Sequence, residues 1–239
     1  MLKNIIVLSA GDIGNQVIDV LKQSNSNLKY EVVEYLADLE KYSYDFLAES
    51  RLISFISIVI VPKKILDALG YDGINFHPGP PTHPGWAPQR FAIYDEDETY
   101  GTTAHYMVEK VDAGKIIGID YFAIDKNIKV DELTHKSVES LTRLLNELAV
   151  QLTIEKKCIS LPIPWGPNKT TKKMFEYYCK ISKNITIKEL TKRIRAFGGM
   201  ANSPLYKDAK DGKYLIDNSK KLSAGVRYKN IHGIRFRHE

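Results

Sequence analysis

The amino-acid sequence predicts an α/β fold: a Rossmann-like, mostly parallel sheet with flanking helices, followed by a small C-terminal subdomain rich in β-hairpins. Short apolar runs alternate with segments of helical period through the first half of the chain. The run at residues 52–61 is apolar nearly throughout, as expected of a strand buried on both faces of a parallel sheet. After residue 160 the composition shifts to prolines and then to turn residues between short apolar runs.

The bulk composition is that of a globular protein, with 239 residues, 44% hydrophobic and 26% charged. No apolar run approaches the roughly 20 residues of a membrane-spanning helix, and the N-terminal stretch lacks the apolar core of a secretory signal. The two cysteines form no metal-ligand pattern and no disulfide framework. We therefore expect a cytoplasmic protein with free thiols, no metal and no membrane partner.

The net charge of +5 raises the question of nucleic-acid binding. The basic residues are spread along the chain with acidic residues between them, which favours solvated helix faces over a nucleic-acid patch. We therefore expect no nucleic-acid partner. A positive surface still suits polyanionic small molecules such as diphosphates.

The spacing of apolar residues predicts the first strands and the first helix. Residues 3–9 and 30–35 form apolar, β-rich runs, and between them one helical face carries Ile13, Val17, Val20 and Leu21. The turn at residues 11–14 lacks the full glycine pattern of a dinucleotide site, so we interpret it as a tight strand-to-helix turn.

The next two strands lead toward candidate site residues. The buried strand at residues 52–61 precedes a helix that Pro62 opens and that runs through Leu69. A short strand at residues 73–76 then leads into His77. Ligand sites in such sheets lie outside the carboxyl ends of the strands, and Asn75 and His77 lie at such an end.

Longer elements follow. Residues 101–108 and 115–124 are expected to be strands joined by a turn, and Asp131 is expected to cap a long helix with leucines inward. The proline-rich residues 160–170 form an extended connector. Thr186 and Glu189 then predict a capping-box helix start, and Asp211-Gly212 a hairpin.

These patterns predict an N-terminal catalytic domain at residues 1–184 and a C-terminal helix plus β-hairpin subdomain at residues 185–239. The apolar residues beyond about residue 201 are too few for a core of their own. Because open hairpin edges pair readily with another chain, we expect this segment to join a homodimer.

The segment from Gly73 to Gly114 is the most informative for function. Five prolines and two glycines stiffen residues 78–88 after the strand end, and such loops serve to fix a site. On pattern alone, a surface loop that happens to contain His77, His83 and Trp86 is an equally good interpretation.

A family resemblance favours the functional interpretation. The Asn75-Phe76-His77-Pro78 motif, the loop to Gly85, the Gly101–His105 stretch and the Val111–Ile117 stretch with Asp112 resemble the signature of folate-dependent formyltransferases. The resemblance runs from about Lys3 to Leu152. It implies binding of N10-formyltetrahydrofolate, transfer of its formyl group to an amine, and catalysis by Asn75, His77 and Asp112.

That assignment is chemically sensible. Negative charge builds on the formyl oxygen as an amine attacks, and aimed hydrogen-bond donors are the strongest catalytic device for it. Asn75 offers an amide N–H and His77 a ring N–H. Asp112 is expected to hold His77 in the donating form, raise its pKa and help remove the amine proton.

The resemblance also places the folate. The pterin slot of the family is formed by two loops, which match residues 58–65 and 108–112 here. The side chains expected beside the folate are Ile58, Ile60, Ile65, Val108 and Val111; plain core packing is the alternative for each.

The acceptor amine is inferred from departures within the family. The loop PGPPTHPG resembles sugar N-formyltransferases, and Arg195-Ala196-Phe197 resembles the linker of the sugar and methionyl-tRNA enzymes. This implies a nucleotide-linked amino sugar such as dTDP-4-amino-4,6-dideoxyglucose, for surface polysaccharide biosynthesis. The substrate contacts expected on the following helix are Gln89, Arg90 and Tyr94. Methionyl-tRNA formyltransferase, and a non-catalytic nucleotide- or RNA-binding protein, are the alternatives.

Overall fold

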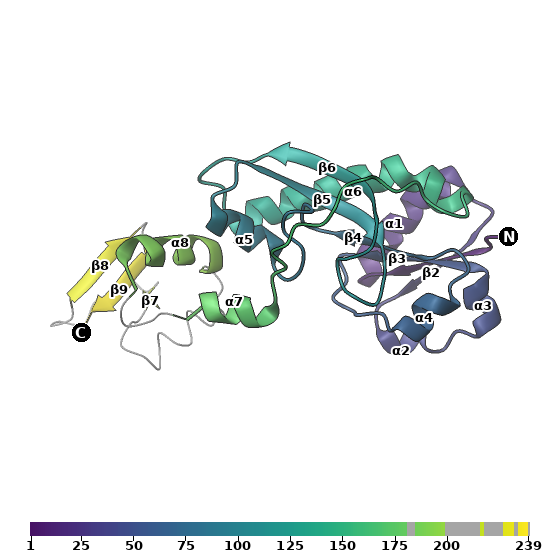
Figure 1. Cartoon of the computed structure of the whole chain (residues 1–239), viewed down its shortest axis with the longest axis horizontal. Helices are drawn as coiled ribbons and strands as arrows, with labels where there is room; N and C mark the ends of the chain where they lie inside the picture. The colour runs from purple at the N-terminus through teal and green to yellow at the C-terminus, as the bar shows by residue number, and fades with distance from the viewer. Residues whose placement is uncertain (181–184, 199–215, 218–226, 232–233, 239) are drawn as a thin grey trace.

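The computed structural model describes residues 1–180, 185–198, 216–217, 227–231 and 234–238. Its main sheet has six strands in the order β2-β1-β3-β4-β5-β6 (Figure 1). The first four strands are parallel: β1 (Asn4–Leu8), β2 (Lys29–Val33), β3 (Ser50–Phe55) and β4 (Gly73–His77). Strands β5 (Thr99–Tyr106) and β6 (Ile116–Ala123) are antiparallel to their neighbours. The predicted α/β class with a mixed, mostly parallel sheet is confirmed.

Helices cover both faces of this sheet (Figure 1). On one face lie α1 (Gly11–Ser24) and α6 (Val130–Ile154), and on the other lie α2 (Leu36–Leu39), α3 (Tyr44–Ala48) and α4 (Lys63–Ala68). The apolar strands explain this layering. In β1, Ile5 and Val7 join the core with α1 and α6, whereas Ile6 and Leu8 join the core with α2, α3 and α4. Successive side chains of a strand point to opposite faces, so each face acquires its own core.

Two predicted boundaries were wrong. The apolar run at residues 52–61 was expected to be one strand, but β3 ends at Phe55 and Ile56 adopts a left-handed φ of 52°. The remaining residues form a loop, and hydrophobicity alone does not show where a strand loses its pairing partners. The long helix begins at Val130 with Lys129 at its N-cap, so Asp131 lies in the first turn instead of capping it. There its charge still favours the helix dipole.

Arg51 fixes the C-terminal end of α6 to the sheet. Its side chain is completely buried, and its guanidinium donates hydrogen bonds of 2.6–3.0 Å to five backbone carbonyls, those of Tyr71, Gln151, Leu152, Glu155 and Lys156. Four of these carbonyls belong to the last turn of α6 and the residues after it, where helical partners are missing. One buried cation therefore satisfies a helix end that would otherwise leave carbonyls unpaired.

A third core lies beyond β5 and β6. Here α5 (Pro88–Asp95), α7 (Lys172–Tyr178) and α8 (Ile187–Phe197) contribute aromatic side chains, including Phe91, Tyr178 and Phe197. The predicted capping residue Thr186 accepts from the Glu189 amide, whereas the Glu189 carboxylate contacts Tyr94 and Arg193. The helix assigned from sequence to the C-terminal subdomain thus shares a core with α5.

The C-terminal strands β7 (Ile216–Asp217), β8 (Arg227–Ile231) and β9 (Ile234–His238) form a separate antiparallel sheet in the order β7-β9-β8. The predicted hairpin at Asp211-Gly212 lies outside the described residues. The homodimer expected through this segment, and the domain division at residue 184, stay predictions. In the part of the chain that the structure describes, no helix has the length and apolar character needed to cross a membrane.

Candidate active site

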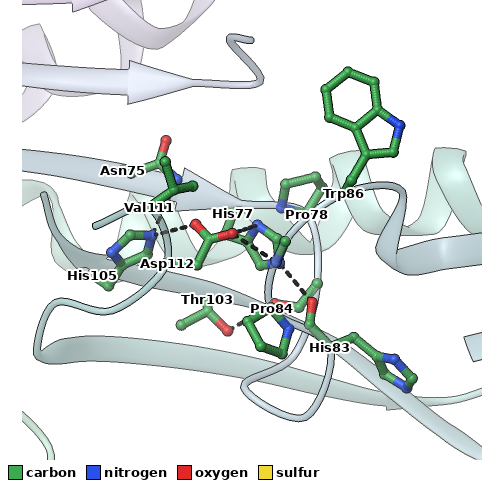
Figure 2. Close-up of polar contacts among 12 residues, drawn as sticks. Asn75, His77, Pro78, His83, Pro84, Trp86, Thr103, His105, Val111 and Asp112 are labelled. Atoms are coloured by element: carbon green, nitrogen blue, oxygen red, sulfur yellow. Dashed lines mark hydrogen bonds and ion pairs between the residues drawn. The ribbon is translucent and has the colours of Figure 1, made fainter. Parts of the chain in front are cut away.

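The site is built on the end of β4. Ile74 and Phe76 point into the core beneath α1 and α6, so the alternating residues Asn75 and His77 face the opposite side. Strand β5 runs antiparallel beside them, with His105 opposite Asn75 and Thr103 opposite His77. Figure 2 shows Asp112 lying between His77 and His105. The structure therefore brings together Asn75, His77 and Asp112, which the sequence analysis expected to act as a unit.

His77 has both ring nitrogens engaged, and only 3% of its surface is exposed. Its Nε2 atom lies 3.0 Å from the carbonyl oxygen of His83. Because a carbonyl oxygen only accepts, Nε2 carries the hydrogen. The other nitrogen, Nδ1, lies 3.5 Å from Oδ2 of Asp112. The neutral ring therefore presents a lone pair to a carboxylate, with room for one proton between them.

The electrostatics of His77 differ from the expectation. Burial lowers the pKa of His77 below its ordinary value, and the charge of Asp112 acts in the opposite direction without outweighing it. Asp112 was expected to raise this pKa and to hold His77 as a donor. The Asp112 charge shifts the pKa in the expected direction, but the desolvation of the buried ring has the larger effect on the pKa. The hydrogen bond to the His83 carbonyl, not Asp112, places the ring hydrogen on Nε2.

Asp112 is held ionised in a strained position. Its φ of 44° is left-handed, which is costly for a residue other than glycine and is typical of functional sites. Its Oδ2 accepts from the Gly85 amide at 2.8 Å, and its Oδ1 lies 3.3 Å from Nε2 of His105. Burial favours the protonated carboxyl. The contacts with His105 and His77, whose protonated rings attract the carboxylate, and the hydrogen bond from the Gly85 amide outweigh it, so the pKa falls to about 2.

His105 is a site residue to which the sequence analysis assigned no role, although it ends the Gly101–His105 stretch of the family signature. Its Nδ1 donates to the Tyr106 carbonyl at 2.8 Å, so the lone pair of the neutral ring is on Nε2, 3.1 Å from Nδ2 of Asn75. The β5–β6 register shifts between Ala104 and His105, a bulge that re-aims nearby side chains. Sequence offers little signal for this contact, because it depends on the register of two strands 30 residues apart.

The proline-rich loop of residues 78–88 is anchored at its start. The Tyr100 hydroxyl donates to the Pro78 carbonyl and the Thr103 hydroxyl to the Gly79 carbonyl, each at 2.8 Å. A Cβ atom on Gly79 would stand 2.7 Å from Nε2 of His77, so a side chain there would displace the ring. These bonds fasten the start of the loop to β5, and the loop carries the His83 carbonyl and the Gly85 amide to the site.

Four of the five side chains expected beside the folate are exposed: Ile58 at 86%, Ile60 at 67%, Val108 at 45% and Val111 at 42%. In the two segments that carry them, Val59 and Met107 pack against the same core cluster as α2, α3 and α4. Ile65 is different. It is buried at 4% exposure within that cluster, because the first turn of α4 directs it inward, and it is better described as a core residue than as a ligand contact.

The expected substrate contacts on α5 are mostly used elsewhere. Arg90 is buried, and its guanidinium donates to the Ala196 carbonyl at 2.9 Å. The Tyr94 hydroxyl donates to the Glu189 carboxylate, also at 2.9 Å. Both side chains therefore fasten α8 to α5, and their assignment as substrate contacts stays a prediction that these bonds do not support. Gln89 is half-buried beside them. Among the described residues, no cluster of three or more His, Cys, Asp or Glu side chains is arranged to hold a metal ion.

Comparisons with known proteins agree with this geometry. A methionyl-tRNA formyltransferase of Bacillus cytotoxicus is 37% identical over 99 residues, which are 41% of this chain and 31% of that protein. The chain thus matches less than a third of the length of this curated relative. A 4-N formyltransferase from Francisella tularensis has a similar fold, with a TM-score of 0.71, 20% identity, and coverage of 98% of this chain and 96% of that one.

A second solved structure is the N-formyltransferase of Helicobacter canadensis in complex with folinic acid and dTDP-3-aminofucose. It has a TM-score of 0.61 and 14% identity, and the match covers 100% of this chain and 99% of that one. At these identities the two structures show a shared fold. The family model described as formyl transferase matches residues 15–148, which is more than half of the chain and includes β4, the loop of residues 78–88 and Asp112. The chain belongs to the formyl transferase family.

Proposed function

We propose that this protein transfers a formyl group from N10-formyltetrahydrofolate to the amine of a nucleotide-linked amino sugar. The observation that carries the proposal is a chain of contacts: the Asn75 amide meets His105, and His105 and His77 lie on either side of Asp112. A donor for a developing negative charge and an acceptor for a proton are the two groups that formyl transfer to an amine requires. Family membership gives the same reaction class.

The described residues fit a folate. A pterin has an apolar face, and the exposed aliphatic side chains of Ile58, Ile60, Val108 and Val111 offer apolar contact on two neighbouring loops. Single exposed aliphatic residues are common, but these four lie on the two loops that match the pterin slot of the family, and we infer that they contact the pterin. The co-substrate, when bound, supplies the electrophilic formyl carbon, and tetrahydrofolate is its leaving group.

Asn75 stabilises the formyl oxygen in this proposal. One N–H of its amide points to Nε2 of His105, 3.1 Å away, which fixes the orientation of the side chain. The second N–H of the same nitrogen is then available for an oxygen that gains negative charge as the amine attacks. A donor held in place before the reaction needs no reorganisation during it, which is why such donors contribute strongly.

His77 and Asp112 take the proton that the amine loses. The Nδ1 lone pair of His77 and the ionised Asp112 face each other across 3.5 Å, so a proton received at Nδ1 is stabilised at once by the carboxylate. The same proton can then pass to the nitrogen of the departing tetrahydrofolate. The bond from the formyl carbon to that nitrogen breaks as the bond to the acceptor amine forms, and the proton count balances.

A sugar acceptor is favoured by the length over which the folds agree. The proteins from Francisella tularensis and Helicobacter canadensis are covered almost end to end, and the latter was solved with a dTDP-amino sugar. The PGPPTHPG loop and the net charge of +5 are also consistent with a diphosphate-bearing substrate. We infer dTDP-4-amino-4,6-dideoxyglucose as the leading candidate. The low cysteine content, two residues in the chain, suits a cytoplasmic enzyme that serves surface polysaccharide synthesis.

The alternative acceptor is methionyl-tRNA, which the 37% identity to the Bacillus cytotoxicus enzyme supports over 99 residues. Both are tested by incubating the purified full chain with N10-formyltetrahydrofolate and, separately, dTDP-, UDP- and GDP-linked amino sugars and methionyl-tRNA. Mass spectrometry of the product and the absorbance of tetrahydrofolate give two readouts. We expect formylation of a dTDP-amino sugar. Formylation of methionyl-tRNA alone would refute the sugar assignment, and formylation of no amine would refute the reaction.

A further inference from the structure

Trp165 contacts both histidines that flank Asp112. It lies in residues 161–170, the segment after α6 that we call the strap. Its indole ring is half-buried and meets His105 at 4.9 Å between ring centroids and His77 at 5.7 Å, with interplanar angles of 89° and 76°. Such edge-to-face contacts fix the relative orientation of aromatic rings. A single indole therefore holds the two imidazoles on either side of the carboxylate.

The strap is also bonded to the loop that carries Asp112. The indole N–H of Trp165 donates to the Gly114 carbonyl at 2.8 Å, and the Lys169 ammonium group donates to the Val111 carbonyl. These two carbonyls bracket Asp112 in the chain. Because Asp112 has a left-handed backbone, its position has to be maintained by surrounding contacts, and the strap supplies two of them.

Neighbouring residues of the strap are bonded to the loop of residues 78–88. The Gly166 amide donates to the Pro81 carbonyl at 2.8 Å, and the Thr170 amide donates to the Pro84 carbonyl at 2.9 Å. Gly85 has a φ of 100°, and a Cβ atom there would lie 2.1 Å from the Thr170 carbonyl oxygen, so the two backbones touch. This loop supplies the carbonyl that binds His77 and the amide that binds Asp112.

We propose, on the basis of the function proposed above, that Trp165 is a positioning residue for formyl transfer. Its indole fixes the rings of His77 and His105 against Asp112 and keeps water from them, while its N–H holds the loop of Asp112. Water admitted beside the Asp112 carboxylate would raise the local dielectric constant and weaken its contacts with His77 and His105. Trp165 acts through these groups and needs no contact with substrate.

Steady-state kinetics of three variants test the role. Trp165→Leu should lower kcat on the order of 10- to 10²-fold, because small displacements of catalytic groups have effects of that size. The KM values should stay within about threefold, since ground-state binding is retained. Trp165→Phe keeps the ring contacts without the N–H and should recover most of the loss. Ile163→Ala alters an exposed strap residue away from the histidines and should match wild type.

A second measurement does not depend on activity. The chain has two tryptophans, so Trp86→Phe leaves Trp165 as the only fluorophore of its kind. A protonated imidazole in contact with indole quenches its fluorescence. We expect emission to fall as the pH is lowered, and the fall to disappear when His77→Asn and His105→Asn are added. If no acceptor is formylated but this quenching occurs, the proposed function fails while the Trp165 contacts stand. Unquenched emission at all pH values, or a Trp165→Leu variant with wild-type kcat, would overturn the inference.

Discussion

The Nε2 atom of His77 donates to the backbone carbonyl of His83, 3.0 Å away, so the chain itself sets the tautomer of this ring. The His83 carbonyl is well placed to do so, because the His83 side chain is bound in turn to Asp97 at 2.6 Å. A backbone acceptor cannot rotate away as a side chain can. The lone pair of neutral His77 is therefore directed toward Asp112 before any substrate arrives.

Removal of either proposed catalytic side chain should impair turnover. Asn75→Ala deletes the proposed donor to the formyl oxygen, and His77→Ala deletes the proton acceptor. We expect kcat to fall by roughly 10²- to 10³-fold in each variant, with an unchanged circular dichroism spectrum. Asn146→Ala, a change on the exposed face of α6, is the matched control. Near-wild-type turnover by both site variants would rule out this mechanism.

The acid limb of the pH profile should lie below the ordinary histidine range. Because burial lowers the pKa of His77 from 6.5, the ring should stay an available proton acceptor as the pH falls past that value. NMR titration of the His77 ring in the free protein separates this ionisation from that of the substrate amine. Asp112→Asn removes a charge that favours the imidazolium, so the midpoint should fall further. A midpoint above 6.5 in the wild-type protein would contradict the expected sign.

The folate surface can be tested at Ile60. This side chain is 67% exposed, so Ile60→Arg should not disturb the core. A charged group where the pterin is expected should raise the folate Kd by at least about tenfold, because the apolar contact is lost and a cation must be desolvated. Binding of the nucleotide sugar should be unaffected. If calorimetry found the same folate affinity in the variant, the pterin would have to bind at another surface. Ile159→Arg, at a similarly exposed position, controls for the added charge.

Gly79 provides a test of ring placement without touching a reacting group. In Gly79→Ala the new methyl group would stand 2.7 Å from Nε2 of His77 and equally close to Pro88, so the ring must move. We expect kcat to fall on the order of tenfold or more, with little change in the thermal midpoint. Full activity in this variant would mean that the His77 to His83 bond is dispensable.

Arg51 makes a purely structural prediction. Arg51→Met removes a buried guanidinium that donates to five backbone carbonyls and should destabilise the fold by roughly 2–4 kcal/mol. That corresponds to about 5–15 °C in Tm for a chain of this size. Arg143→Met breaks an exposed pair with Asp120 and should cost under about 1 kcal/mol. Equal thermal midpoints for the two variants would show that the buried guanidinium does not hold α6.

The residues that sequence could assign are those whose role follows from position along one strand. Asn75 and His77 are two apart at a strand end, and their shared face follows from the period of a strand. Asp112 could be assigned only through the family resemblance, because its contact with His77 depends on the path of the loop that carries it. Strands β1 and β3 were found because their apolar runs are buried on both faces, whereas the end of β3 depends on its neighbours and was misplaced.

Other contacts could not be predicted from the sequence, because they join residues that lie far apart in the chain. His105 reaches Asn75 through an antiparallel register, and Trp165 reaches both histidines from a segment that looked like a plain connector. Arg90 shows the reverse problem. Its position after the site loop suggested a substrate contact, yet its guanidinium donates to the carbonyl of Ala196 in α8, 106 residues away. The sequence shows which side chain can donate a hydrogen bond, but it does not show which group in the folded protein accepts that bond.

The strap has a consequence for the order in which this protein matures during synthesis. A ribosome exposes Asn75, His77 and Asp112 well before residues 161–170, yet those later residues bond to both loops around the three side chains. A nascent chain stalled within α6 therefore holds every group proposed to react, without the segment that encloses them. The proposed role of the strap thus implies that competence for formyl transfer cannot arise before translation has passed Thr170.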